Sequence, residues 1–158
     1  MKLSVNILTW NNQSTINTIL NVLKSELVYT THEIIFIDNG STDDTQRIIN
    51  EWCFYNSFTS RAIFNPEHKG ISIGKNQGIN TSSGEYIFML DGDVVPVAGS
   101  ILEMINWMDN NPYKHALGMY PNKFSTTPDH SETICRELFE PKKFKCCCLY
   151  YGIFRRSM

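Results

Sequence analysis

The feature that most constrains the fold of this chain is an alternation of short apolar runs with segments of helical character. The runs that have the length and composition of strands are Leu3–Thr9, Glu33–Ile37, Arg61–Phe64 and Tyr86–Leu90. Each run is followed by a helical apolar pattern or a helix start, such as Ile16, Ile19, Leu20 and Leu23. Strands that alternate with helices build parallel sheets with right-handed crossovers. The sequence therefore predicts an α/β fold in which helices flank a mostly parallel central sheet.

The boundaries of later elements are less clearly marked. Ser41, with Asp44 three residues later, resembles a capping box and predicts a helix start there. Beyond residue 113, only Ala116–Tyr120 and Cys146–Phe154 have the composition of strands. The polar segment 122–132 between them is interpreted as a loop over a binding site.

Length and composition limit the number of domains and the kinds of binding partner that we expect. With 158 residues, 42% of them hydrophobic, the chain suffices for one core, so we expect a single domain over 1–158. A formal net charge of -2 gives no general attraction to a polyanion, and nucleic acid is not expected as a partner. There is neither a signal-peptide pattern nor an apolar run of about 18 residues, so a cytoplasmic protein without a transmembrane segment is expected. The cysteines lack the paired spacing of a zinc site and are expected to be reduced thiols.

Polar residues stand at the carboxyl ends of three predicted strands. Thr9, Asp38 and Asp91 each end an apolar run. In open parallel sheets, ligands bind outside the carboxyl ends of the strands, so these clusters are expected to meet at one edge. Asp38 has the groups to accept hydrogen bonds from a nucleobase or a ribose hydroxyl, although an aspartate there also fits a turn or a helix cap.

Asp91-Gly92-Asp93 is the most informative motif. Two carboxylates separated by a glycine at the end of a buried strand suit Mg²⁺ or Mn²⁺, which commonly complete their shells with substrate phosphates and water. The glycine is interpreted as allowing a ligand to approach the backbone. The same tripeptide also occurs in ordinary turns, so the motif gains its meaning from its neighbours.

A glycine-containing segment supplies the third element of the expected site. Gly70 to Asn76 contains a second glycine and Lys75, a cation suited to phosphate. The segment matches neither a Walker loop nor the dinucleotide-binding glycine pattern. By itself it therefore indicates phosphate binding only weakly.

Taken together and in this order, the motifs resemble the family 2 glycosyltransferases of GT-A fold. The resemblance covers about residues 3 to 111 and rests on Ser4–Asn11, Ile35–Asp43, Gly70–Gly78 and Gly84–Asp93. It implies a Rossmann-like GT-A domain that transfers a sugar, with inversion, from a nucleoside-diphosphate sugar (a UDP- or GDP-sugar) to an acceptor hydroxyl with Mn²⁺ or Mg²⁺. Residues 1–111 would be the nucleotide-sugar-binding part, and 112–158 a partial C-terminal part.

The resemblance also implies roles for individual positions. Asp91 and Asp93 would hold the metal ion, and Trp10 stands where tyrosine is commoner in the family. The residues implied to bind the nucleotide sugar are Thr9, Trp10, Asn11, Asp38, Asn39, Gly70, Lys75, Asn76, Asp91 and Gly92.

The catalytic base is not identified by the sequence. The family carries an acidic residue in a later segment that deprotonates the acceptor, and no such segment is recognised before Met158. The conceivable substitutes are Asp129, Glu132, Glu137 and Glu140, each of which also fits a solvated surface position. One alternative is therefore a nucleotide-sugar-binding module without turnover. A nucleotidyltransferase is a further alternative, disfavoured because the loop after the first strand has no glycine, lysine or arginine.

Overall fold

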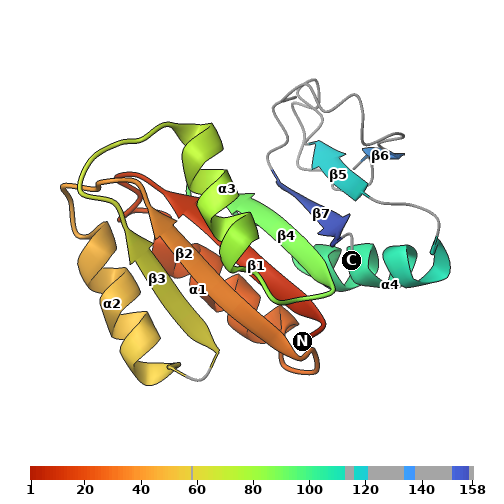
Figure 1. The fold of residues 1–158 in the computed structure, drawn as a ribbon. Helices are drawn as coiled ribbons and strands as arrows, with labels where there is room; N and C mark the ends of the chain where they lie inside the picture. The colour runs from red at the N-terminus through yellow and green to blue at the C-terminus, as the bar shows by residue number, and fades with distance from the viewer. Residues whose placement is uncertain (58, 113–115, 121–133, 138–150, 157–158) are drawn as a thin grey trace, which may run out of the picture.

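The chain folds around one sheet, seen in a computed structural model that describes residues 1–57, 59–112, 116–120, 134–137 and 151–156. The strands are β1 (Leu3–Thr9), β2 (His32–Asp38), β3 (Ser60–Phe64), β4 (Tyr86–Asp91), β5 (Ala116–Tyr120), β6 (Ile134–Glu137) and β7 (Tyr151–Arg155). The helices are α1 (Ile16–Glu26), α2 (Thr45–Tyr55), α3 (Ile71–Thr81) and α4 (Ser100–Asn110). Figure 1 shows their arrangement.

The strand order creates a crevice between β1 and β4. Among the described residues the order is β3-β2-β1-β4-β7-β5-β6, with parallel pairing from β3 to β4 and antiparallel pairing beyond β4. The chain progresses from β1 to β3 in one direction and returns to place β4 on the other side of β1. This reversal is a topological switch point, where open α/β sheets bind ligands. The predicted mostly parallel α/β fold is confirmed.

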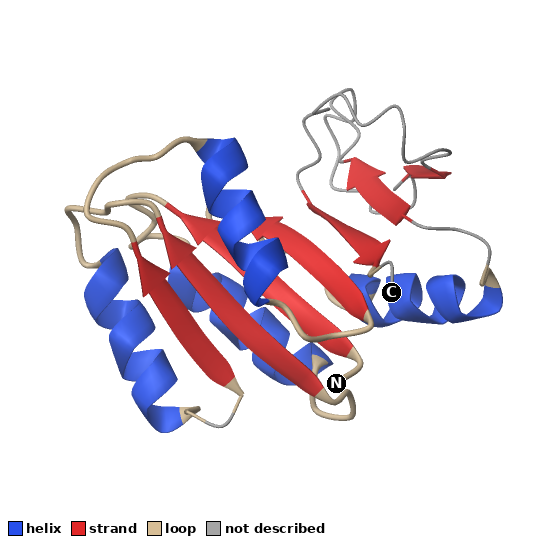
Figure 2. Cartoon of the chain, in the orientation of Figure 1, coloured by secondary structure: helices blue, strands red, loops and turns tan. Residues whose placement is uncertain are grey.

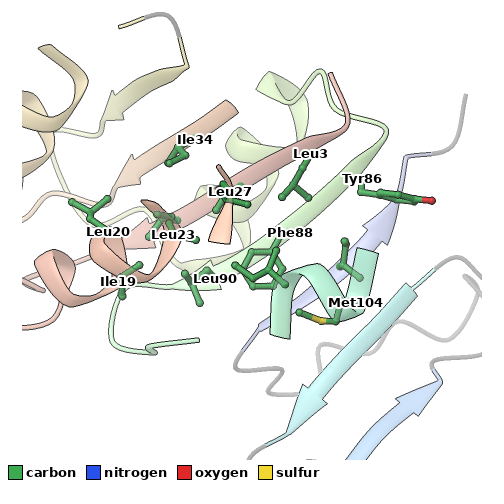
Figure 3. Packing of buried hydrophobic residues seen from close by; sticks show 14 of the residues in the cluster. Leu3, Ile19, Leu20, Leu23, Leu27, Ile34, Tyr86, Phe88, Leu90 and Met104 are labelled. Atoms are coloured by element: carbon green, nitrogen blue, oxygen red, sulfur yellow. The ribbon is translucent and has the colours of Figure 1, made fainter. Parts of the chain in front are cut away.

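The main hydrophobic core lies between the sheet and helices α1, α2 and α4. Alternate residues of β1, β2 and β4 point into it, and α1 and α4 contribute a stripe of apolar side chains (Figure 3). Phe36, Tyr86 and Phe88 are its largest fully buried side chains. Burial of such side chains contributes about 1.5–3 kcal/mol each, which is what fixes the register of the strands.

Helix α3 covers the opposite face of the sheet, whereas α1 lies behind it (Figure 2). It contacts the sheet through glycines: a Cβ at Gly74 would lie 2.5 Å from Leu8 Cδ1, and one at Gly78 would lie 2.8 Å from Ile37 Cδ1. The isoleucines of α3 point outward instead, since Ile71 is 56% exposed. Helix α3 therefore packs against β1 and β2 with no room for a Cβ at either glycine.

Polar groups are also buried on the α3 face. The Glu33 carboxylate accepts hydrogen bonds from Ser4 Oγ at 2.6 Å and from the backbone and hydroxyl of Ser83 at 2.6 and 2.7 Å, and it forms an ion pair with Arg61. Burial opposes ionisation of Glu33, but these hydrogen bonds and the guanidinium outweigh it and hold its pKa below the ordinary value.

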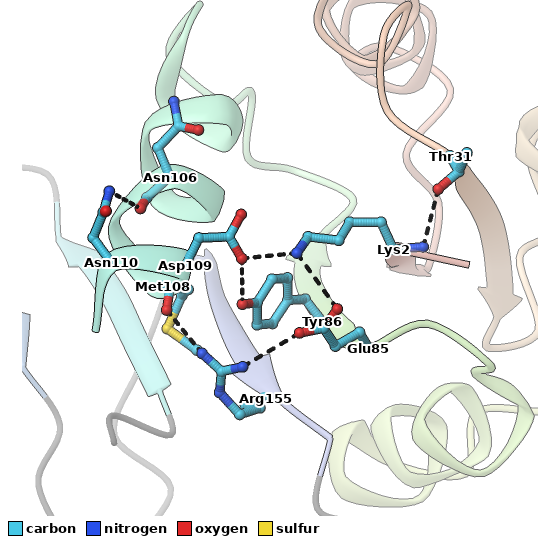
Figure 4. A network of polar contacts seen from close by, with 9 residues as sticks. All are labelled: Lys2, Thr31, Glu85, Tyr86, Asn106, Met108, Asp109, Asn110 and Arg155. Carbon is cyan, nitrogen blue, oxygen red and sulfur yellow. Dashed lines mark hydrogen bonds and ion pairs between the residues drawn. The ribbon is translucent and has the colours of Figure 1, made fainter. Parts of the chain in front are cut away.

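A second polar network joins β7 to the parallel part of the sheet (Figure 4). Tyr86 lies between two cations, with Lys2 Nζ 4.7 Å and the Arg155 guanidinium carbon 4.9 Å from its ring centroid. Its hydroxyl donates to Asp109 Oδ1 at 2.7 Å, and Lys2 Nζ lies 2.7 Å from the same oxygen. Burial opposes ionisation of Asp109, but its hydrogen bonds from Lys2 and Tyr86 lower its pKa overall.

Two predictions of local structure were wrong. The capping box is not formed, because α2 begins only at Thr45, with Asp44 as its N-cap, and the Ser41 hydroxyl donates to Asp38 instead. Strand β6 was not predicted and is held by its pairing with β5. The expected strand Cys146–Phe154 overlaps β7, but residues 146–150 and the interpreted loop 122–132 lie outside the described residues.

Candidate functional site

A cleft of about 310 Å³ opens at the carboxyl ends of β1 and β4. This is the switch point of the sheet, and the volume is at the lower end of that of small-molecule sites. Its lining residues come from the ends of β1 and β4, from the loops that follow β1, β2, β3 and β4, and from the start of α3, namely Leu8, Thr9, Trp10, Asn12, Asn39, His68, Ile71, Asp91, Gly92 and Asp93. The predicted convergence of polar clusters at one edge is therefore present.

The Asp-Gly-Asp motif is held against the end of β1 and the loop that follows it. Gly92 N–H donates to the Leu8 carbonyl at 2.8 Å, and Thr15 Oγ1 donates to the Gly92 carbonyl at 2.6 Å. A Cβ on Gly92 would lie 2.5 Å from Asn12 Oδ1. The glycine thus makes room for Asn12 of the same chain, which differs from the expectation that it admits a ligand.

The two carboxylates of the motif have different surroundings. Asp91 Oδ1 is 3.0 Å from Lys75 Nζ, and the two side chains are 33% and 27% exposed respectively. Asp93 is exposed at the cleft. The described residues contain no group of three or more His, Cys, Asp or Glu side chains that could hold a metal ion. This donor set fits a Mg²⁺- or Mn²⁺-like cation that takes its remaining oxygen ligands from phosphate and water.

Asp38 is fully buried and lies outside the residues that line the cleft. It accepts hydrogen bonds from Thr9 Oγ1 at 3.1 Å, from Ser41 N–H at 3.0 Å and from Gln46 Nε2 at 2.7 Å, in addition to the Ser41 hydroxyl. A carboxylate accepts about four such bonds, so its capacity is used within the protein. In this structure Asp38 supports the loop after β2, beside its cleft-lining neighbours Thr9 and Asn39.

An amide network holds the loop between β3 and α3. Asn39 Oδ1 accepts from Lys69 N–H at 3.0 Å, and Asn39 Nδ2 donates to the Gly70 carbonyl at 3.3 Å. Asn65 and Gln77 exchange two side-chain hydrogen bonds of 2.9 Å. Asn39 and Asn65 are almost fully buried, so these hydrogen bonds attach the loop that contains His68 to the residue that follows β2.

Two aromatic rings stand on one wall of the cleft. Trp10, which is 54% exposed, and His68 meet edge to face with ring centroids 4.8 Å apart and an interplanar angle of 72°. Leu8, Asn12, His68 and Ile71 line the cleft but were not among the predicted site residues. The signal that could have found them is position, since Leu8 lies near the carboxyl end of β1 and the other three lie in segments that follow the carboxyl ends of β1 and β3.

The structure separates the predicted site residues into two groups. Those that line the cleft are Thr9, Trp10, Asn39, Asp91, Gly92 and Asp93. Those outside its lining are Asn11, Asp38, Gly70, Lys75 and Asn76. Asn11, at φ 54°, accepts from Thr42 N–H at 2.8 Å, and Gly70, at φ 89°, is the N-cap of α3. Asn76 is exposed on α3.

Comparison with known proteins assigns the chain to a family. The family model described as Glycosyl transferase family 2 matches residues 4–146. The chain belongs to glycosyl transferase family 2. This confirms the family resemblance that was based on the segments Ser4–Asn11, Ile35–Asp43, Gly70–Gly78 and Gly84–Asp93.

Relatives in the family include proteins with named activities. The chain is 29% identical over 104 residues to the cholesterol galactosyltransferase of Borreliella burgdorferi, covering 66% of this chain and 28% of that protein. It is 28% identical over 122 residues to the poly(ribitol-phosphate) beta-N-acetylglucosaminyltransferase TarP of Staphylococcus aureus, covering 75% and 36%. The chain therefore spans well under half the length of these relatives.

Solved structures support the GT-A fold. S. aureus TarS 1-349 superposes with a TM-score of 0.67 at 22% identity, over 81% of this chain and 38% of that one. The mannosyltransferase PcManGT of Pyrobaculum calidifontis also gives a TM-score of 0.67, at 18% identity over 77% and 36%. Within the described residues of this family 2 chain, no helix is long and apolar enough to cross a membrane.

Proposed function

We propose that this chain is the donor-binding part of a glycosyltransferase, which transfers a sugar with inversion from a UDP- or GDP-sugar to an acceptor hydroxyl. The observation that carries the proposal is the position of Asp91 and Asp93 beside a cleft at the switch point between β1 and β4. Residues 1–111 supply every described residue that lines this cleft.

Two solved relatives of the fold support the choice of donor. TarS 1-349 has been solved in complex with UDP-GlcNAc and with UDP, and PcManGT in complex with GDP-Man and Mn²⁺. For the present chain we propose the same class of ligand, a nucleoside-diphosphate sugar together with a divalent cation, because the cleft offers aromatic, amide and paired carboxylate groups in one place.

Different side chains of the cleft would bind different parts of the donor. Trp10 and His68 offer ring surfaces against which a nucleobase can stack, and Asn39 places a polar side chain at the end of β2. Asp91 and Asp93 would hold the cation, which when bound neutralises charge on the leaving diphosphate. The hydrogen bonds that join Gly92 to Leu8 of β1 and to Thr15 in the loop after it keep both carboxylates in place before the donor arrives.

A binding module without turnover is the second candidate. Among the residues that the structure describes, the carboxylates that line the cleft are those of Asp91 and Asp93, and no further acidic group stands there to deprotonate an acceptor. A missing base reduces the rate by about 10² to 10⁴-fold. Asp129, Glu132 and Glu140 lie outside the described residues, as does the side chain of Glu137.

Calorimetry with UDP and GDP, each with and without Mn²⁺ or Mg²⁺, tests the donor site. We expect either UDP or GDP to bind only when the cation is present. In Asp93→Ala, adding the cation should no longer change the affinity for the nucleotide. Glu103→Ala, which removes an exposed carboxylate on α4, is the matched control and should bind like the wild type. Nucleotide binding that needs no cation, and is unchanged in Asp93→Ala, would refute the proposal.

Turnover separates the two candidates. The same chain is incubated with UDP-GlcNAc or GDP-mannose and Mn²⁺, and released nucleoside diphosphate is measured. Release above the rate without protein supports a transferase, whereas tight nucleotide binding with no release supports the binding module.

A further inference from the structure

Lys75 contacts Asp91 from outside the cleft. Its Nζ lies 3.0 Å from Asp91 Oδ1, yet Lys75 is not among the residues that line the cleft. The preceding residue, Gly74, faces Leu8 of β1 with no room for a Cβ. This close approach of α3 to the sheet brings the ammonium to the end of β4.

We infer that Lys75 is a positioning residue that acts through Asp91, as a resident counter-ion that makes cation binding at Asp91 and Asp93 conditional on the nucleotide. The inference rests on the proposed donor site and defines how that site would be loaded. It also changes the expected role of Lys75, which the sequence suggested as a direct partner of phosphate.

The physical reason is the repulsion between like charges. A divalent cation that arrives alone meets an Asp91 carboxylate already paired with an ammonium, and both side chains are only partly exposed, so water screens the repulsion incompletely. A nucleoside diphosphate carries its own negative charge, which offsets the ammonium, and it provides further oxygen ligands for the cation.

Two consequences follow for the bound states. Lys75 weakens the binding of the cation alone more than it weakens the binding of the cation with its nucleotide. The two ligands are therefore coupled, and by linkage each increases the affinity of the site for the other. In the empty site, the same ion pair keeps the Asp91 carboxylate oriented from the α3 side.

Lys75→Met tests the inference, because it keeps an unbranched apolar stem and removes the charge. Binding of Mn²⁺ is measured by electron paramagnetic resonance, first without nucleotide and then with saturating UDP. We expect Lys75→Met to bind Mn²⁺ alone about 3- to 10-fold more tightly than the wild type, the effect of one partly screened charge. The enhancement of Mn²⁺ affinity by UDP should fall by a similar factor.

Two further variants separate this role from a general effect of charge or folding. Lys75→Arg keeps a positive charge at this position and should bind Mn²⁺ like the wild type. Lys24→Met removes a lysine charge from the last turn of α1, away from the cleft, and should also behave like the wild type. Circular dichroism confirms that each variant is folded.

Equal Mn²⁺ affinity of the wild type and Lys75→Met without nucleotide, including no measurable binding by either, would overturn the inference. Weaker UDP binding by Lys75→Met with unchanged Mn²⁺ affinity would also overturn it, since it would indicate direct contact with phosphate. The proposed function fails by a different result, the absence of cation-dependent nucleotide binding by the wild type. The titration with Mn²⁺ alone still decides the role of Lys75 in that case.

Discussion

Substitution of Gly92 by alanine tests whether the Asp-Gly-Asp motif is positioned by the loop after β1. The new Cβ would lie 2.5 Å from Asn12 Oδ1, 2.9 Å from Asn12 Cγ and 3.0 Å from the Leu8 carbonyl oxygen. Asn12 Oδ1 accepts the Trp10 N–H at 2.8 Å, so moving this side chain away breaks a hydrogen bond.

The expected destabilisation can be built from these contacts. Loss of the hydrogen bond from Trp10 to Asn12 costs about 1 kcal/mol. Overpacking against the Leu8 carbonyl adds about 1 kcal/mol more, because backbone yields less readily than a side chain. Replacing glycine with alanine also restricts the unfolded chain, which stabilises the folded protein by roughly 0.4–1 kcal/mol. We therefore expect Gly92→Ala to lower the free energy of unfolding by about 1–1.6 kcal/mol.

Urea denaturation of a double-mutant cycle measures the contact directly. In Asn12→Ala the side-chain oxygen is absent, so adding Gly92→Ala to that variant leaves only the contact with the Leu8 carbonyl. The double variant should be more stable than the sum of the single effects predicts, by about 1 kcal/mol. Additive effects, or a Gly92→Ala variant as stable as the wild type, would refute this account of the glycine.

Two further predictions concern stability. Glu26, buried in the last turn of α1, accepts the Gly99 N–H at 2.6 Å and the Ile101 N–H at 3.1 Å at the start of α4. Because this carboxylate caps α4, Glu26→Gln should lower the free energy of unfolding, measured by urea denaturation, by about 1–2 kcal/mol. An unchanged urea midpoint would contradict this role of Glu26. Folding lowers the pKa of Glu33 and of Asp109, so their stabilisation is present above their ordinary values of 4.5 and 3.8 and is lost as the pH falls below that range. Unfolding measured from pH 7 to pH 3 should therefore show a smaller loss of stability in Glu33→Gln than in the wild type, and equal losses would count against it.

The sequence by itself determined the parallel core of the sheet. The strands from Leu3 to Asp91, their order along the chain and the polar residues at their carboxyl ends all follow from local patterns, because strand and helix periodicities are properties of neighbouring residues. The Asp91-Gly92-Asp93 motif was also predicted at the carboxyl end of a buried strand, and in the structure its first residue ends β4.

Only the tertiary structure decided what the polar residues contact. Asp38 is buried by its own loop, Lys75 pairs with Asp91, and Asn12 occupies the space beside Gly92. His68 reaches the cleft because the order β3-β2-β1-β4 brings loops from distant parts of the chain together. Such contacts depend on strand register and on the depth at which a helix packs, and no local pattern in the sequence encodes either one. The Asp-Gly-Asp motif and Lys75 could thus be found in the sequence, but the ion pair between Lys75 and Asp91 could not.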